Sequence, residues 1–368
     1  MGGGGCDNPA MTPQTPRRRR PPGLRDVAEL AGVSMKTVSN VVHGYARVRP
    51  ETRERVQAAI ERTGYRPQLA AQQLRTGASG IVTLALPSLT FSYFSDIAQH
   101  FIDQAQERGR TVVLHSTSAG REQEVEVLEG FKRRLGDGVI FNPLLLEEQY
   151  FRSVDELPQP TMLIGEHIPD RDLPAGSDYV RVDNTRATSD ATDHLLESGR
   201  RTFAFVGDLP TDDPTRHPHG SAPLRIDGFR RSLARHGLNH DRAPLQRVEN
   251  WHRHDGRSAA HVLLDEHPDV DAIVCANDEL ALGVLAGLRE RGRRVPQDVG
   301  VVGYDDSPES PYSFPPLTTI SPDKTFLARI ALDMLIERID GYDGPPRIVT
   351  TPHQLVVRDS SRAATLEI

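Results

Sequence analysis

Residues 24–44 read LRDVAELAGVSMKTVSNVVHG, and no other stretch of the chain is as informative. It predicts a short helix, a turn at Gly32 and a second helix, because apolar residues recur at helical spacing on both sides of the glycine. Val27, Ala31 and Val38 are expected to face one another across the turn, and the hydroxyl of Ser34 to cap the second helix. The pattern is typical of a helix-turn-helix unit, whose second helix lies in the major groove of DNA.

The second predicted helix has a largely polar outer face. We expect its outward residues to be Met35, Lys36, Thr37, Ser39, Asn40 and His43. A helix that reads base edges needs side chains of this kind, because the major groove presents hydrogen-bond donors and acceptors. The alternative is an ordinary small helical hairpin, and the charge of the flanking residues argues against it.

Charge is distributed unevenly along the chain. Between Arg17 and Thr76 there are 13 arginines and lysines against five acids, a net charge of +8. The whole chain carries −7, so the remainder carries −15. A basic head on an acidic body suits a protein that neutralises nucleic-acid phosphates with one end only.

Composition and cysteine usage argue against several other classes. The two cysteines, Cys6 in the N-terminal tail and Cys275 after an apolar run, are not expected to form a disulfide. No apolar run of membrane-spanning length or secretory leader is visible, so we expect a cytoplasmic protein. Residues 1–22 are rich in Gly, Pro and Arg and are expected to stay unfolded. Arg17–Arg20 within them are either nonspecific phosphate contacts or a solvated tail.

A third helix and a joint are expected after the hairpin. Pro50 and Glu51 favour a helix start, and Gly64 favours its end. The sequence QLAAQQLR at 68–75 predicts another short helix, and TGASG at 76–80 reads as a flexible joint.

From Gly80 onward, strand and helix patterns alternate. Strands are predicted at 81–86, 111–115, 138–141, 161–164, 202–206, 272–275 and 299–302. Helices are predicted near 94–108, 121–135, 185–198, 224–236, 257–266 and 280–291. This alternation predicts parallel sheets covered by helices, in two lobes that divide near Tyr179. A ligand of such lobes would lie beyond the carboxyl ends of the strands, in the cleft between them.

Together these features resemble the LacI/GalR family of bacterial transcription regulators. The resemblance covers Leu24 to about Val357 and depends on five motifs in the family's order. They are DVAELAGVSMKTVSNVVHG (26–44), RPETRERVQAAIERTGYRP (49–67), QLAAQQLRTG (68–77), CANDELALGVLAGLRERGRRVPQDVGVVGYDD (275–306) and PPLTTI (315–320). It implies an all-α helix-turn-helix head and an α/β two-lobed body like a periplasmic binding protein, with parallel sheets.

The resemblance also implies domain boundaries and an assembly. The tail covers 1–22, the helix-turn-helix domain 23–66, the hinge helix and linker 67–79, the body 80–357 and the C-terminal tail 358–368. Lobe 1 covers about 80–178 and 322–351, and lobe 2 about 179–321 and 352–357. A homodimer on a pseudo-palindromic, double-stranded operator is expected. A dimer is favoured over a tetramer, because the sequence shows no obvious C-terminal heptad helix.

On the second helix, the resemblance assigns roles by position. Met35 and Lys36 occupy the main base-reading places, with Asn40 one turn further on. Family members often have Arg at the place of Asn40, so a guanine contact there is in doubt, since Asn prefers adenine. Phosphate or peripheral contacts fall to Ser34, Thr37, Ser39, His43, Arg47 and Thr52. Leu74 matches an apolar wedge inserted into the minor groove, although core packing is the better interpretation of this residue without the family.

In the body, the resemblance implies an effector site. The matching residues are Phe91, Tyr93, Phe94, Glu166, Arg225, Trp251, Asn277 and Asp305. Carboxylates and amides suit vicinal hydroxyls, an arginine offers a fixed fork of donors, and aromatic rings suit the C–H faces of a sugar. Taken singly, each of these residues has an alternative interpretation as a loop cap or a surface residue. Asp278 is expected to cap a helix and Glu279 to be a solvated acid.

Other motifs point to no further chemistry. His217 and His219 lie near two acids, but an exposed loop explains them better than a metal site. His252 and His254 lie near the expected cleft, where a pH effect on effector binding is conceivable. The chain lacks a recognisable phosphate loop, nucleophile or catalytic carboxylate pair, so neither an enzyme nor a cofactor or metal is expected.

The sequence therefore predicts a DNA-binding transcription regulator, a repressor, whose operator affinity is controlled by a small-molecule effector between the lobes. Trp251 and Glu166 favour a neutral sugar or polyol, with a purine or a phosphorylated sugar as alternatives. A transporter's solute-binding protein would share the body but not the basic head, and an enzyme on this scaffold would need a catalytic constellation. Operator DNA, the effector and a second copy of the chain are the expected partners, with no membrane. Whether the effector releases or promotes DNA binding is left open.

Overall fold

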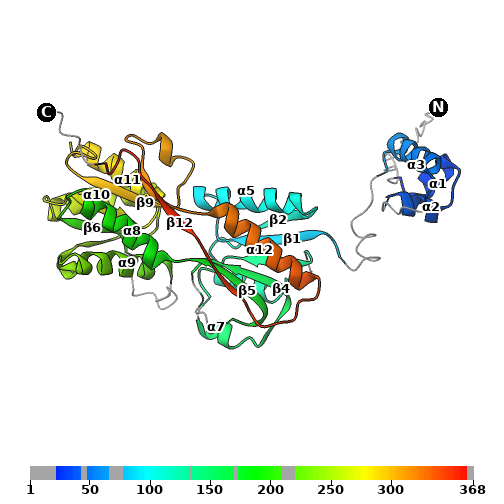
Figure 1. The fold of residues 1–368 in the computed structure, drawn as a ribbon, viewed down its shortest axis with the longest axis horizontal. Coiled ribbons are helices and arrows are strands. Elements are labelled where there is room, and N and C mark those ends of the chain that lie inside the picture. Colours follow the sequence, from blue (N-terminus) through cyan, green and yellow to red (C-terminus); the bar gives the residue numbers. More distant parts are fainter. Residues whose placement is uncertain are drawn as a thin grey trace, which may run out of the picture. The chain divides into compact units, whose positions relative to one another are not determined.

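The computed structural model describes residues 22–42, 48–65, 78–131, 135–146, 148–166, 168, 173–208 and 220–362. The chain divides into two compact units, a head of residues 1–79 and a body of residues 80–368 (Figure 1). Within the described ranges, no helix is long and apolar enough to cross a lipid bilayer.

The described part of the head consists of α1 (Leu24–Ala31), α2 (Met35–Val42) and α3 (Pro50–Thr63). Gly32 ends α1 with a φ of 64°, a left-handed conformation that suits glycine. The hydroxyl oxygen of Ser34 accepts the Thr37 amide hydrogen at 3.1 Å and so caps α2, as predicted. Each helix contributes one fully buried valine to a common core: Val27, Val38 and Val56. The predicted helix-turn-helix is confirmed.

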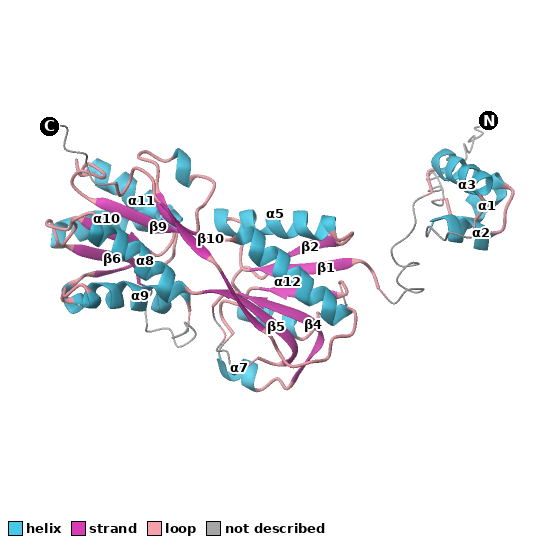
Figure 2. Ribbon diagram, viewed as in Figure 1, coloured by secondary structure: helices cyan, strands magenta, loops and turns pink. Residues whose placement is uncertain are grey.

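Lobe 1 of the body is built on six parallel strands in the order β11-β5-β4-β3-β1-β2. The strands are β1 (Ile81–Leu86), β2 (Thr111–Ser116), β3 (Gly138–Phe141), β4 (Glu156–Ile164), β5 (Ala175–Val182) and β11 (Ile348–Thr351). Helices cover both faces of the sheet (Figure 2). One face packs against α5 (Ser92–Glu107) and α12 (Lys324–Ile339), and the other against α6 (Arg121–Leu128) and α7 (Glu148–Arg152).

Successive residues of the lobe 1 strands pack on opposite faces of the sheet. In β3, Ile140 belongs to the apolar core beneath α5 and α12, whereas Val139 and Phe141 belong to the core beneath α6 and α7. All three side chains are fully buried. A parallel strand buried on both faces reads as an uninterrupted apolar run, which is why this strand was recognisable in the sequence.

Lobe 2 repeats the design with the strand order β12-β10-β9-β8-β6-β7. Its strands are β6 (Phe203–Asp208), β7 (Leu245–Arg247), β8 (Ala272–Cys275), β9 (Gly300–Tyr304), β10 (Thr318–Pro322) and β12 (His353–Val356). Only β12 in this sheet is antiparallel to its neighbour, β10. The helices are α8 (Asn184–Glu197), α9 (Ser221–Arg235), α10 (Arg253–Glu266) and α11 (Asp278–Glu290), with 3-10 turns at His240–Arg242 and Ser310–Tyr312. The predicted α/β body with two largely parallel sheets is confirmed.

The chain passes between the lobes three times. It leaves lobe 1 between β5 and α8, returns between β10 and α12, and leaves again between β11 and β12. The last two connections are short: a single residue, Asp323, separates β10 from α12, and Pro352 separates β11 from β12. The lobes are therefore joined at a narrow set of segments, as two bodies that close on a ligand need to be.

One predicted helix is shorter than expected. The helix expected at 121–135 ends at Leu128, as α6. Gly130 and Phe131 follow with φ values of 86° and 59°, and this left-handed backbone cannot continue a right-handed helix.

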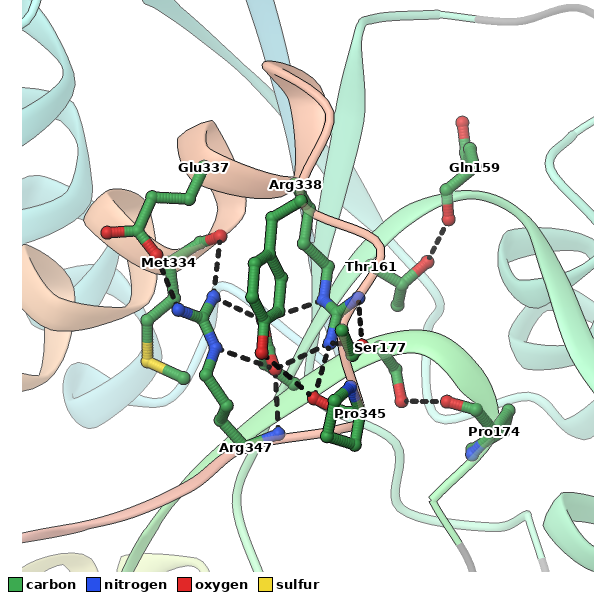
Figure 3. A network of polar contacts seen from close by, with 12 residues as sticks. Gln159, Thr161, Pro174, Ser177, Met334, Glu337, Arg338, Pro345 and Arg347 are labelled. Atoms are coloured by element: carbon green, nitrogen blue, oxygen red, sulfur yellow. Dashed lines mark hydrogen bonds and ion pairs between the residues drawn. The ribbon is translucent and has the colours of Figure 1, made fainter.

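A buried ion network fastens α12 to the lobe 1 sheet. Arg338 on α12 and Arg347, just before β11, converge at its centre (Figure 3). Both guanidinium groups donate to the fully buried carboxylate of Asp178 on β5, Arg338 Nε at 2.7 Å and Arg347 Nη2 at 2.8 Å. Burial raises the pKa of Asp178, but the hydrogen bonds from the two arginines outweigh it and hold the pKa below its usual range. The network ties three chain segments together.

Candidate functional site

The outer face of α2 is as polar and accessible as the sequence predicts. Met35 is 55% exposed, Lys36 and Ser34 are exposed, and Thr37, Ser39 and Asn40 are partly exposed. Thr52, in the first turn of α3, is also partly exposed. The predicted DNA contacts His43, Arg47 and Leu74 lie outside the described residues.

A basic residue of α3 has a structural role within the head. Arg55 Nη2 donates to the carbonyl oxygens of Ala31 and Gly32 at 2.7 and 3.3 Å. These carbonyls lie at the C-terminal end of α1, where a positive charge is favourable. Arg55 therefore fixes the turn that orients α2. This structural role could not be inferred from the charge of the residue.

In the body, the predicted effector residues follow strand ends. Phe91, Tyr93 and Phe94 come from the segment after β1, Glu166 follows β4, Asn277 follows β8 and Asp305 follows β9. Arg225 lies on α9, and Trp251 lies between β7 and α10. These are the carboxyl ends of parallel strands and the helices or loops beyond them, where ligands of such sheets bind.

Arg225 lies at the centre of the residues that come together. Its side chain is 8% exposed, and Nε donates to Asn184 Oδ1 at 2.7 Å while Nη1 donates to the Ala276 carbonyl. The guanidinium carbon lies 3.5 Å from the centre of the Tyr304 ring and 5.3 Å from that of the Trp251 ring. Two hydrogen bonds and two aromatic faces thus hold the guanidinium in one orientation.

Acidic and phenolic groups surround this arginine. Asp305 Oδ1 lies 3.9 Å from Arg225 Nη2. Burial raises the pKa of Asp305 to about 8, and the charge of Arg225 opposes that rise. Burial, followed by the charges of Glu166 and Asp305, raises the pKa of the Tyr93 phenol. Burial also raises the pKa of Tyr304, so both phenols are neutral hydrogen-bonding groups at neutral pH.

Two further predicted residues have contacts that define their positions. Glu166 of lobe 1 accepts a hydrogen bond from the Ser221 hydroxyl of lobe 2 at 3.0 Å. The Trp251 indole donates to the Gly207 carbonyl at 3.0 Å. Glu166 thus reaches across the cleft, and Trp251 is fixed at the end of β6.

Asn277 is held in place by its own contacts. Its Oδ1 accepts the Leu280 amide hydrogen at 2.9 Å and caps α11, and its Nδ2 donates to the Trp251 carbonyl at 3.2 Å. The side chain therefore positions Trp251 and starts α11. Asn277 is next to Arg225's acceptor, Ala276, in the chain.

Two interpretations of neighbouring acids were wrong. Asp278 was expected to cap a helix, but Asn277 does so. The buried Asp278 carboxylate instead accepts the Ser307 amide and the hydroxyls of Ser310 and Thr319, at 2.6 to 2.7 Å. Burial raises its pKa to about 6, with those hydroxyl groups acting in the opposite direction. Glu279, expected to be a solvated acid, is 13% exposed and pairs with Arg253 at 2.6 Å.

The remaining two predicted residues are apart from Arg225. Phe94 packs against the lobe 1 core beneath α5 and α12. Phe91 stacks on His252 of lobe 2, with ring centres 4.4 Å apart and planes 13° from parallel. Beside this pair, Ser92 donates to Glu309 at 2.7 Å, and Arg253 donates to the same carboxylate oxygen at 3.0 Å. These residues join the lobes directly.

The structure also identifies residues that the sequence interpretation missed. Asn142 follows β3, is 6% exposed, and has a side-chain oxygen without a hydrogen-bond partner among the described residues. It lies against Gly165, which precedes Glu166, and a side chain at Gly165 would approach this oxygen to 3.0 Å. Tyr304, whose hydroxyl is likewise buried without such a partner, supports Arg225. The signal for both was a polar atom directly at the end of an apolar strand.

The described residues offer no metal site, and the cavity near the lobe connections is not lined by this cluster. Among the described residues, no group of three His, Cys, Asp or Glu side chains is placed to hold a metal ion, and His217 and His219 lie outside them. A cavity of about 500 Å³ lies near the lobe connections and is bordered by Asp96, Asp306 and Lys324, but not by the predicted effector residues.

The architecture defines a class: a helix-turn-helix head joined to a two-lobed, ligand-binding body. Residues 23–68 match the family model "Bacterial regulatory proteins, lacI family", and residues 192–361 match "Periplasmic binding protein-like domain". The regulator CelR of Thermobifida fusca is 34% identical over 359 residues, 93% of this chain and 99% of CelR. The chain belongs to the LacI family. It is a DNA-binding transcriptional regulator, and the family is not one of enzymes.

Solved structures agree with this assignment. A lac repressor dimer bound to operator and the anti-inducer ONPF is 29% identical, with a TM-score of 0.79, over 94% of this chain and 100% of that one. A complex of CelR with cellobiose is 30% identical, with a TM-score of 0.66, over 92% and 99% of the two chains.

Proposed function

We propose that this regulator is a repressor whose operator affinity is controlled by a neutral sugar or polyol bound between its lobes. The observation that carries the proposal is the cluster of Arg225, Trp251, Tyr304 and Asp305 at the strand ends of lobe 2, with Glu166 of lobe 1 beside it. A fixed guanidinium, neutral phenols, carboxyl groups and an indole are the groups that recognise vicinal hydroxyls and C–H faces. The CelR relative, solved with cellobiose, adds support.

The charges near Arg225 favour a neutral ligand over a phosphorylated one. Glu166 acts electrostatically on the phenols that flank Arg225, whereas Asp305, with a pKa of about 8, is mainly protonated at neutral pH. Arg225 already donates to Asn184 and Ala276, which leaves Nη2 as its less committed nitrogen. A phosphate needs several converging donors and no nearby acid. A purine remains the main alternative effector.

In the head, we propose that α2 reads the operator. Met35 and Lys36 supply the exposed base-reading side chains, and Asn40 contributes a further contact with a preference for adenine. Contacts with the DNA phosphate backbone or at the periphery are proposed for Ser34, Thr37, Ser39, Thr52, His43 and Arg47. Leu74 is the proposed minor-groove wedge.

We also propose that two copies of the chain bind one operator. Two patches support this assembly. Tyr312 and Phe314 are 88% and 87% exposed on lobe 2, and Val113 and Leu114 are exposed on the edge strand β2 of lobe 1. Apolar surface of this kind is typically covered by a partner. Because the operator is chromosomal DNA, the proposal places the protein in the cytoplasm.

The experiment is a thermal-shift screen of the full chain against cellobiose, other neutral sugars, sugar phosphates and nucleobases. A ligand that binds the native state raises the melting temperature by mass action. Any hit is then added to an operator-binding measurement. A neutral sugar or polyol that shifts both readouts is the expected result. A response to nucleobases or sugar phosphates alone would refute the proposed effector class.

A further inference from the structure

Lys324 is a buried ammonium where the chain crosses between the lobes. It is the first residue of α12 and is 7% exposed. Nζ donates to Asp96 Oδ2 on α5 of lobe 1 at 2.5 Å, and to the Asp306 carbonyl of lobe 2 at 2.9 Å. One side chain therefore connects a helix of lobe 1 to the residue that follows Asp305.

The backbone that Lys324 contacts has a strained conformation. Asp305 has a φ of 111° and Asp306 a φ of 49°, and residues with a side chain rarely adopt such values. A strained conformation of this kind persists only when its surroundings fix it. The Asp306 carboxylate is held by Arg358 at 2.7 Å, whereas its carbonyl is held by Lys324. The orientation of Asp305 thus depends partly on an ammonium from lobe 1.

The charge of Lys324 is not explained by packing alone. A buried ion pair is weak evidence for stability, because apolar residues of similar volume often replace it without loss. Here the ammonium has partners on both lobes, and it lies 5.9 Å from the centre of the ring of Tyr93, which borders the proposed effector site. The cavity of about 500 Å³ beside Asp96 and Asp306 leaves space for the ammonium to shift.

We propose that Lys324 is a positioning residue that couples Asp305 to helix α5 through Asp96. The inference rests on the proposed function, in which the effector meets Asp305. A ligand that moves Asp305 changes the position of the Asp306 carbonyl. The Lys324 ammonium, which donates to this carbonyl, then either moves with it or loses the hydrogen bond. Asp96 then passes the change to α5, in addition to any direct contact of the ligand with Tyr93 on the same helix.

The test is amide hydrogen exchange of the intact protein, measured without DNA or ligand. The two segments compared are the first turns of α5 and residues 304–310. The hydrogen bonds and ion pairs of Asp96 go to Lys324 and His100. Ser92 of the same helix turn also contacts Glu309, so the double variant described below decides whether an effect of Asp96→Asn at residues 304–310 passes through Lys324. We expect Asp96→Asn and Lys324→Met each to speed exchange in both segments by about threefold or more.

The double variant and a surface control sharpen the result. Asp96→Asn combined with Lys324→Met should speed exchange at 304–310 no more than Lys324→Met alone, because both act through one contact. Arg329→Met removes an exposed cation from the same helix and should change neither segment. Unchanged exchange at 304–310 in Asp96→Asn, or effects that simply add, would overturn the coupling. A failed ligand screen with intact coupling would instead refute only the proposed effector.

Discussion

Arg225 and Asp305 are both buried, yet the guanidinium nitrogen Nη2 and the carboxyl oxygen Oδ1 are 3.9 Å apart. Each is held elsewhere, Arg225 by Asn184 and Ala276, and Asp305 by its backbone contact with Ile320. The carboxyl group and the guanidinium are both desolvated but are not closely paired. They can therefore bind a polar group of a ligand. A ligand hydroxyl between them can donate to one and accept from the other.

Replacing Arg225 with Met should abolish the effector response while leaving operator binding intact. Methionine keeps much of the side chain's length but donates no hydrogen bond, so a ligand that meets the guanidinium should bind about 10- to 100-fold more weakly. Arg231→Met is the matched control, because Arg231 lies on the same helix and is 67% exposed. Fluorescence anisotropy of operator DNA, with and without the screened ligand, measures both properties. An unchanged response in Arg225→Met would remove this residue from the site.

Asp305 makes stability depend on pH in a defined direction. Its pKa of about 8 lies above the ordinary value of 3.8, so the folded state keeps a proton that the unfolded state has released. The free energy of unfolding should therefore fall as pH rises from 6 to 8, by at most about 1.4 kcal/mol per pH unit from this group. Asp278, with a pKa of about 6, contributes mainly below that range.

Asp305→Asn should flatten this decline. Urea unfolding at pH 6, 7 and 8 measures it, and Trp251 fluorescence reports on the body because it is the only tryptophan. Histidines titrate in both proteins, so the comparison between wild type and variant isolates Asp305. Equal slopes in the two proteins would mean that Asp305 is ionised at pH 6.

Elements that read as short apolar runs between turn residues could be predicted from the sequence, and elements without such a clear pattern could not. The strands 81–86, 138–141 and 272–275 were predicted with the bounds observed, because they are short apolar runs between turn residues. Helix α12 was not predicted, since KTFLARIALDMLIERI is buried on several sides and has little amphipathic contrast. Strand β5 reads AGSDYVRV, and its buried Asp178 concealed it. A paired charge inside a sheet cannot be recognised before its partners are known.

The candidate site was predictable only as far as chain position determines contact. The family resemblance indicated Glu166, Asn277 and Asp305 at strand ends, but the residues that each side chain meets depend on the packing of both lobes. Asn277 and Asp278 show the limit, because it is Asn277 that caps α11, whereas Asp278 accepts the Ser307 amide in a buried network. Lys324 was missed altogether, since its partners are more than 200 residues and 18 residues away along the chain.

The α2 assignment predicts a change of operator preference. Lys36→Ala and Asn40→Ala should each lose about 1–3 kcal/mol of discrimination at particular base positions. Arg25→Ala is the control, because Arg25 is an exposed α1 residue paired with Glu29. Selection from randomised duplexes at fixed salt, followed by affinity measurements, gives the position-specific loss. A uniform loss on all sequences would reassign the residue to a phosphate contact.

The Asp178 network predicts a large effect on the stability of the body. Asp178→Asn leaves Arg338, whose side chain is 2% exposed, without its carboxylate, and should destabilise the body by about 3 kcal/mol. Asp333→Asn, which breaks a partly exposed pair with Arg108 and a longer one with Arg329, should cost about 1 kcal/mol or less. Because the pKa of Asp178 is lowered, its stabilisation is complete above pH 3.8 and is lost as pH falls further. Urea unfolding measures the free energy of unfolding of wild type and Asp178→Asn. The difference between the two should be constant near neutral pH and should shrink below pH 3.8. If the difference does not shrink there, the charge of the carboxylate is not what holds α12.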